Sequence, residues 1–365
     1  MINNLKQIIY KNNLDGYIIP KNDEYFTEYS KESNLEKFAK FTGSAGFILI
    51  LEKKNYLFVD GRYTLQAKKE SGKNFVILEI PFSWPKDIIN NKKGNLKIGF
   101  FPKIFTTNTL KKYFENTCKL VPINENIFVN EKKILKTNKY FFKLNDKITG
   151  ESYISKLKKV KKYLKSKKIN YLFISSGENL CWLLNIRGRD LPNSPVGNLQ
   201  GVISDDGQVH LMVNKEKIKK IKNYIINNKI KIYPEFKLLN ILNLLKKKNF
   251  CIDETSCSVF NENLIKSKFK IKQTTDPIFS LKSIKNNTEI NNMIEAHIKD
   301  GVALTKFLYW IKNIQNIHKY DELIIEKKLE NFRKRNKDYL YPSFSSIVGS
   351  GPNGAVIHYR SGKKT

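Results

Sequence analysis

Residues 341–360 read YPSFSSIVGSGPNGAVIHYR, the densest run of chemically specific residues in the chain. Gly349, Gly351 and Gly354 allow positive φ angles and close approach of the backbone. They are followed by the run AVIHYR (355–360), whose β-branched and aromatic residues are typical of a strand. The pattern therefore predicts a strand just beyond a tight loop, with His358 presented on that strand.

Three interpretations of this segment compete. The glycines match the pattern G-x-G-x-x-G of dinucleotide sites, but that pattern must open a helix whose N-terminus faces a pyrophosphate. Pro352 inside the pattern and the β-like run after it argue against this interpretation. Two others remain open on these residues alone: a glycine hairpin with His358 as an ordinary half-buried residue, and a catalytic site in which neutral His358 binds substrate or moves a proton.

The length and composition are those of a globular protein. The chain has 365 residues, 41% of them hydrophobic, which is enough for two or three domains. No apolar run is long enough to span a bilayer, so no membrane partner is predicted. Cys118, Cys181, Cys251 and Cys257 form no C-x-x-C pair, which argues against a disulfide framework or a zinc knuckle and fits a reducing cytoplasm.

The net charge is strongly positive, with 66 Lys and Arg against 34 Asp and Glu, or +32. Such a charge is compatible with binding to nucleic acid or to an anionic membrane. However, the lysines are spread over all segments, and runs such as KKVKKYLKSKK (158–168) follow helical periods typical of solvated faces. The chain contains no arginine cluster interleaved with aromatic residues. We therefore expect no specific nucleic-acid partner and a charge spread over the surface.

The same order of expected elements occurs twice in the first 285 residues: helix, strand, helix, strand, turn, strand. The turn of the second copy, Asp205-Asp206-Gly207, is a good hairpin turn. This repeat predicts two α/β domains of one design, residues 1–145 and residues 146–285. The expected strands are 14–20, 46–52 and 55–63 in the first copy, and 169–175, 200–204 and 208–214 in the second.

The pattern changes at Asn286. Apolar residues then recur near a 3.6-residue period, with Asn287 or Thr288 as the expected N-cap. A second helix is expected from about Asp321 to Arg335. Two helices and one hairpin bury little core unaided. Residues 286–365 are therefore expected to begin a third domain, and the chain is expected to be a fragment of something longer.

Five ordered motifs make the chain resemble the three-domain, cytosolic type of Xaa-Pro aminopeptidase (aminopeptidase P), in the creatinase/prolidase superfamily and peptidase family M24. Any one of them alone would be a weak signal, but their order along the whole chain is specific. They are YIIPKNDEYFTEY (17–29) with FTGSAG (41–46), FVDGRYTLQA (58–67), WLLNIRGRDLPNSPV (182–196), LKSIKNNTEINNMIEAHIKDGVAL (281–304) and GPNGAVIHYR (351–360).

The resemblance implies an α/β fold class: two related creatinase-N-like mixed α/β domains, followed by the beginning of a pita-bread (α+β) catalytic domain. It implies a cytoplasmic, homodimeric metallopeptidase that releases the N-terminal residue from peptides with proline in second position, using two metal ions, usually Mn²⁺. By the same resemblance, His358 is the catalytic, substrate-binding histidine and Arg62 reaches the substrate from the first domain. A surface-turn arginine remains the alternative for Arg62. For Arg187 a structural salt bridge is at least as well supported as a functional role.

The resemblance also defines what this chain does not match. The family holds its metals with two aspartates, a histidine and two glutamates, and none of these is matched, so no metal ligand is assigned. Asp253, Glu254 and Asp276 belong to the second domain and do not substitute for them. Since two-metal hydrolysis needs the missing ligands, we expect the 365-residue chain to be inactive by itself. The alternative is a non-catalytic binding module on the same scaffold.

Overall fold

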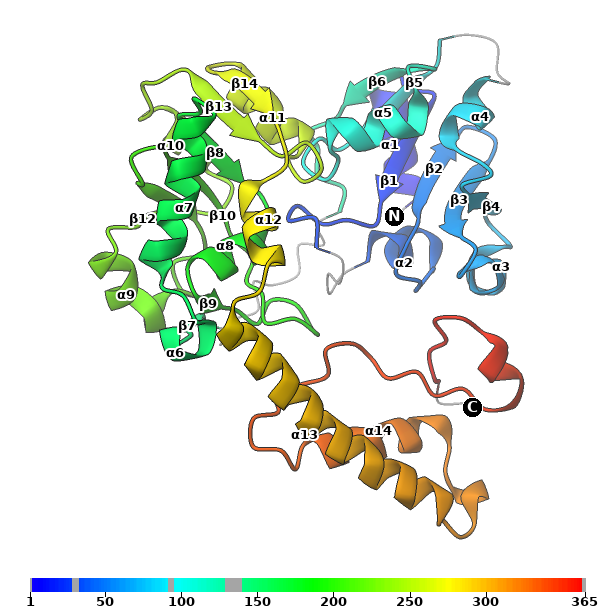
Figure 1. Cartoon of the computed structure of the whole chain (residues 1–365). Helices are drawn as coiled ribbons and strands as arrows, with labels where there is room; N and C mark the ends of the chain where they lie inside the picture. Colours follow the sequence, from blue (N-terminus) through cyan, green and yellow to red (C-terminus); the bar gives the residue numbers. More distant parts are fainter. Residues whose placement is uncertain (1, 28–32, 91–94, 129–139, 363–365) are drawn as a thin grey trace. The chain divides into compact units, whose positions relative to one another are not determined.

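The structure is a computed structural model and describes residues 2–27, 33–90, 95–128 and 140–362 (Figure 1). The chain divides into two compact units, one of residues 1–144 and 151–284, the other of residues 145–150 and 285–365. All strands of the described residues belong to the first unit.

The first sheet has six strands in the order β4-β3-β2-β1-β5-β6. Strands β1 and β2 are buried along their whole length, as the apolar sequences GYIIP and FILIL predict for strands covered on both faces. Strand β2 pairs antiparallel with β1 and β3, whereas the remaining neighbours pair in parallel. The strands are β1 Gly16–Pro20, β2 Phe47–Leu51, β3 Asn55–Asp60, β4 Val76–Ile80, β5 Lys97–Phe100 and β6 Lys119–Pro122.

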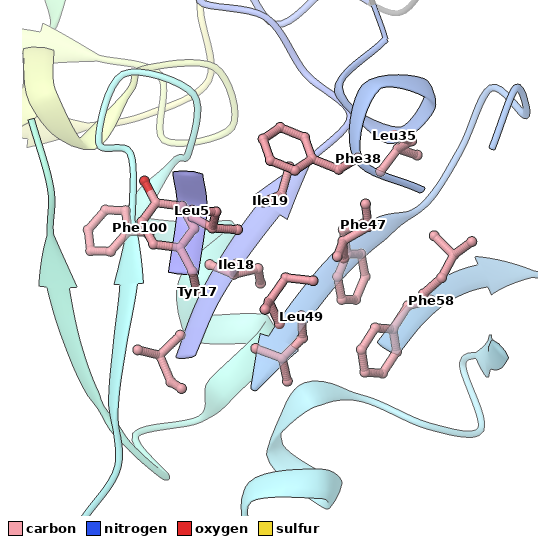
Figure 2. Close-up of a cluster of buried hydrophobic side chains, with 14 of the residues drawn as sticks. Leu5, Tyr17, Ile18, Ile19, Leu35, Phe38, Phe47, Leu49, Phe58 and Phe100 are labelled. Carbon is pink, nitrogen blue, oxygen red and sulfur yellow. The ribbon is translucent and has the colours of Figure 1, made fainter. Parts of the chain in front are cut away.

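Aromatic side chains fill much of the core around this sheet. Figure 2 shows Phe47 of β2 beside Phe58 of β3, with their rings stacked at a centroid distance of 4.7 Å. Tyr113 of helix α5 (Thr107–Phe114) stacks on Phe47 at 4.1 Å. These contacts bury large apolar surfaces, the main source of stability in such a core. The helices of this region are α1 Ile2–Lys11, α2 Asn34–Ala39, α3 Thr64–Ser71, α4 Pro85–Asn90 and α5 Thr107–Phe114.

The second sheet repeats the design with the strand order β12-β11-β10-β8-β13-β14. Its strands are β8 Tyr171–Ile174, β10 Gln200–Ser204, β11 Val209–Met212, β12 Lys231–Tyr233, β13 Asn249–Ile252 and β14 Lys270–Gln273. Its helices are α7 Tyr153–Ser166, α8 Gly177–Leu183, α9 Lys222–Asn227, α10 Leu238–Leu242, α11 Val259–Lys266 and α12 Pro277–Ser283, with a short helix η1 at Lys219–Ile221. A two-stranded sheet joins β7 Phe142–Lys143 to β9 Ile186–Arg187.

The two six-stranded sheets correspond strand by strand. In each, a central strand (β1 or β8) has an antiparallel neighbour on one side and a parallel neighbour on the other. The antiparallel neighbour continues through a hairpin, and each sheet ends in a parallel pair at both edges. The common topology expected from the repeated element order is therefore confirmed.

The second unit is helical. It contains α6 Asp146–Thr149, α13 Asn287–Lys312, α14 Glu322–Arg333 and the short helices η2 Ile317–Lys319 and η3 Gly351–Ala355. Helix α13 begins one or two residues earlier than expected, because its N-cap is Asn286 and not Asn287 or Thr288. Asn286 forms a capping box with Glu289, and its side chain also donates to the carbonyl of Thr149 at 2.9 Å.

Helix α13 buries little of its apolar surface within this unit. Ile290, Met293 and Ile298 are 43 to 63% exposed, and its buried residues are Ala303 and Phe307. Helix α13 has 26 residues, but charged and polar side chains interrupt its apolar sequence. No helix of the described residues is long and apolar enough to cross a bilayer. The small core of this unit agrees with the expectation from the sequence.

The expected strand at 355–360 is wrong. Residues 351–355 form the 3₁₀ helix η3, and His358 lies in a turn with a φ of +55°. A strand needs a neighbour to pair its backbone N–H and C=O groups. The described part of the second unit contains no strand that could pair with this segment. The β propensity of Val356 and Ile357 is therefore not expressed in this structure.

Candidate active-site residues

Arg62 lies in the turn that follows β3. Its guanidinium forms a two-pronged ion pair with Asp60, with Nε 2.9 Å from Oδ1 and Nη2 2.7 Å from Oδ2. The guanidinium carbon also lies 5.3 Å from the centre of the Tyr63 ring. These two contacts orient the guanidinium, while 47% of the Arg62 side-chain surface stays exposed. The residue is thus held in place and accessible.

The segment FTGSAG (41–46) lies against the Arg62 turn. The hydroxyl groups of Ser44 and Tyr63 are 2.5 Å apart, and Tyr63 is buried. The Thr42 backbone N–H and hydroxyl both donate to the carboxylate of Glu70 in α3, at 2.8 and 2.9 Å. Two of the motifs quoted from the sequence therefore form one hydrogen-bonded structure in space.

Arg187 has a structural environment. Its Nη1 donates to the carbonyls of Cys181 and Ile186, at 3.2 and 2.9 Å. In the same motif, Asp190 accepts a hydrogen bond from the Asn198 backbone and pairs with Lys217 at 2.9 Å. These contacts hold the segment after β9 in place and favour the structural interpretation of Arg187.

His358 is exposed and lies three residues after the end of η3. Its φ of +55° is in the left-handed region, which costs about 1–2 kcal/mol for a residue with a Cβ atom. Histidine is one of the few residue types other than glycine that is enriched there. Arg62 belongs to the first unit and His358 to the second.

Glu322, the first residue of α14, was not predicted from the sequence as a site residue. It is 4% exposed, and its carboxylate accepts hydrogen bonds from three residues of the segment 350–359. An acid in the first turn of a helix is ordinary, because the helix dipole favours it there. No local sequence signal therefore separates Glu322 from other first-turn acids, and only the three-dimensional contacts identify it.

The described residues do not supply a metal centre. No group of three or more His, Cys, Asp or Glu among them is placed to hold a metal ion. A hollow of about 660 Å³ in the second unit carries acids, but these are paired with basic groups. Asp300 binds Arg333 at 2.6 Å, and Asp338 binds Lys299 at 2.7 Å. This arrangement does not fit the ligand set implied by the resemblance.

The comparison with known protein families covers nearly the whole chain. Residues 1–128 and 132–289 each match a creatinase/prolidase N-terminal domain, and residues 291–365 match metallopeptidase family M24. The chain is therefore similar to proteins of the creatinase/prolidase family along nearly its whole length. It carries two creatinase-like N-terminal domains followed by the start of an M24 catalytic domain, as the sequence motifs predicted.

Curated relatives extend this result. The chain is 31% identical over 392 residues to Xaa-Pro aminopeptidase 1 of Dictyostelium discoideum, covering 100% of this chain and 62% of that protein. It is 28% identical over 389 residues to the probable Xaa-Pro aminopeptidase P of Colletotrichum graminicola, covering 98% of this chain and 63% of that protein. The chain spans between 56% and 63% of the length of the eight curated relatives compared.

A solved structure shares the fold. The X-prolyl aminopeptidase of Caenorhabditis elegans, described as a cytosolic enzyme with a di-nuclear active site, matches with a TM-score of 0.87 at 21% identity. The match covers 96% of this chain and 60% of that chain. At this level of identity the likeness shows the fold.

Proposed function

We propose that this chain is the N-terminal part of an Xaa-Pro aminopeptidase, which releases the first residue of a peptide whose second residue is proline. The observation that carries the proposal is the ordered match of the three family segments along the chain, together with curated relatives of this name that align with nearly all of it. A bond that precedes proline lacks the usual peptide N–H, so its cleavage requires a dedicated pocket.

In this proposal His358 and Arg62 contact the substrate. An imidazole can donate or accept a proton near neutral pH, which suits a catalytic group beside the scissile bond. The exposed guanidinium of Arg62, already oriented by Asp60, can donate hydrogen bonds to a carbonyl or carboxylate of the peptide. Both roles are supported by the family motifs in which the residues stand.

The proposed enzyme uses two metal ions, which we assign as Mn²⁺, and works as a homodimer in the cytoplasm. Such a metal pair would lower the pKa of a bound water molecule and would polarise the scissile carbonyl. The described residues of this chain do not form the ligand set. We therefore propose that the ligands belong to further polypeptide of the kind that makes the relatives longer, and that the 365 residues alone do not catalyse the reaction.

The test of the proposed activity is substrate selectivity. A chain extended to the length of its relatives should release the first residue of an Xaa-Pro tripeptide in the presence of Mn²⁺, and should leave the matched Xaa-Ala tripeptide intact. His358→Ala should lower turnover strongly. If the extended chain binds both peptides and cleaves neither, the alternative of a non-catalytic binding module on this scaffold is the correct one.

A further inference from the structure

The carboxylate of Glu322 is buried at the N-terminus of α14. Asp321 is the N-cap of this helix, and its side chain already accepts a hydrogen bond from the N–H of Ile324 at 2.7 Å. The capping requirement is therefore met by Asp321. Glu322 has turned away from solvent, with 4% of its surface exposed, and a carboxylate is buried only where donors compensate for the lost water.

In the described part of the segment 350–359, three groups donate hydrogen bonds to this carboxylate. The backbone N–H of Ser350 donates to Oε1 at 2.6 Å, and the side-chain amide of Asn353 donates to the same oxygen at 3.1 Å. The hydroxyl of Tyr359 donates to Oε2 at 2.7 Å. Hydrogen bonds to an ionised acceptor are stronger than neutral ones. One side chain therefore ties together the beginning, the middle and the end of a ten-residue segment, 350–359.

The segment 350–359 needs hydrogen bonds of this kind to keep one backbone conformation. Gly351 and Gly354 give its backbone many accessible conformations in the absence of contacts, and fixing them costs conformational entropy. His358 adds a left-handed conformation, which persists only where the surrounding contacts determine it. Tyr359, one of the three donors, directly follows His358 in the chain. The hydrogen bond between Tyr359 and Glu322 therefore restrains the backbone directly beside His358.

We infer that Glu322 is a positioning residue for His358: its carboxylate fixes the segment 350–359 so that the imidazole is presented in one place. The inference rests on the proposed role of His358 in substrate binding and catalysis. Glu322 itself contacts no substrate in this scheme. A displacement of about 1 Å of a catalytic group can lower turnover about a hundredfold, so the anchor has a direct consequence for rate.

The first experiment needs no activity and uses the 365-residue chain. Amide hydrogen exchange at Ser350 is measured in wild type, Glu322→Ala, Glu322→Gln and Tyr359→Phe. Glu322→Ala removes all three acceptor contacts and should accelerate exchange at Ser350 by about tenfold or more. Glu322→Gln keeps an oxygen for Ser350 and Asn353, and its amide can donate to the Tyr359 hydroxyl, so it removes the charge and should have a smaller effect. Tyr359→Phe removes one contact and should also have a smaller effect than Glu322→Ala. Glu326→Gln, on the same helix and outside these contacts, is the matched control and should change nothing.

The second experiment separates positioning from simple stabilisation. In the chain extended to the length of its relatives, Glu322→Ala should lower kcat at least about tenfold and change KM less than about threefold. In a His358→Ala background the same substitution should have almost no further effect on kcat, because the two residues act as one unit.

Two results would overturn the inference. Unchanged exchange at Ser350 in Glu322→Ala would show that the carboxylate does not anchor the segment. An equal loss of kcat with and without His358 would show that Glu322 acts on folding and not through the imidazole. If the extended wild type cleaves no Xaa-Pro peptide, the proposed function fails instead, and the exchange experiment still decides whether the anchor exists.

Discussion

Asp60 holds Arg62 across the turn after β3 with two parallel contacts, Nε to Oδ1 at 2.9 Å and Nη2 to Oδ2 at 2.7 Å. Such a fork fixes the plane of the guanidinium as well as its position. The pair is also exposed enough that solvent screens it, with 47% of the Arg62 side chain and 30% of the Asp60 side chain accessible. The ion pair therefore orients the guanidinium of Arg62 and contributes little to the stability of the fold.

We expect Asp60→Asn and Arg62→Lys to affect substrate binding in the extended enzyme and to leave folding nearly unchanged. Exposed ion pairs contribute roughly 0–1 kcal/mol to stability, so Tm should shift little. Loss of the fork should raise KM for an Xaa-Pro peptide about three- to tenfold, since it removes about 1 kcal/mol of oriented hydrogen bonding. Lys69→Ala, on the exposed face of α3, is the control. A KM for Arg62→Lys equal to that of wild type would remove Arg62 from the site.

Asp276 makes stability depend on pH. It is buried beside Asn179, whose side-chain amide donates to Oδ2 at 2.7 Å, and burial raises the pKa of the Asp276 carboxyl to about 6. A carboxyl whose pKa is raised on folding binds its proton more tightly in the folded chain. The protonated Asp276 carboxyl therefore adds to the free energy of unfolding. This contribution is complete below the pKa of the unfolded chain, about 4, and is lost as the pH rises through about 6.

Asp276→Asn mimics the protonated carboxyl, so the variant should not lose stability as the pH rises through about 6. The Asn oxygen can still accept from the N–H of Ile278, which donates to Asp276 Oδ1 at 2.8 Å. The stability of the variant relative to wild type should increase by up to about 3 kcal/mol between pH 4 and pH 7.5, as measured by urea unfolding at both pH values. A constant difference between the two proteins would contradict the assigned pKa.

Two glycines should respond to alanine with opposite signs. A Cβ atom at Gly197 would lie 1.6 Å from Cε1 of Phe141, a buried side chain, so Gly197→Ala should destabilise the first unit by about 3 kcal/mol or more. At Gly301, inside α13, a Cβ atom meets nothing within 4 Å. Gly301→Ala should therefore stabilise the helix by about 0.5–1 kcal/mol. Thermal unfolding of both variants decides the matter, and equal shifts in Tm would contradict the packing described.

The net charge of +32 should give only weak, non-specific binding to DNA. Non-specific binding depends on the release of counterions, so a mobility shift seen at about 50 mM salt should be lost near 200 mM. Tight, sequence-selective binding at the higher salt concentration would show that the lysines form a continuous basic groove.

Local patterns were sufficient for most of the first unit. The apolar runs at β1 and β2 and the turn Asp205-Asp206-Gly207 predict strands and a hairpin that the structure contains. Gly207 has the positive φ, +98°, that such a turn requires. Because both sheets use the same local signals in the same order, their common topology could be predicted without any long-range information.

Local patterns failed where the structure depends on distant partners. The run AVIHYR has the propensity of a strand, but propensity needs a neighbouring strand to be expressed, and the segment turns instead. Glu322 could not be predicted because Ser350, Asn353 and Tyr359, which donate to it, lie 28 to 37 residues further along the chain. His358 could be named from its motif, whereas the contacts that hold its segment could not.

We propose that these residues belong to a peptidase whose metal ligands lie outside them. This is tested most directly by measuring bound Mn²⁺ and Xaa-Pro cleavage side by side for the 365-residue chain and for a chain extended to the length of its relatives. We expect about two Mn²⁺ ions per extended chain with Mn²⁺-dependent cleavage, and neither property in the 365-residue chain. Stoichiometric Mn²⁺ and Xaa-Pro hydrolysis by the 365-residue chain alone would contradict the account.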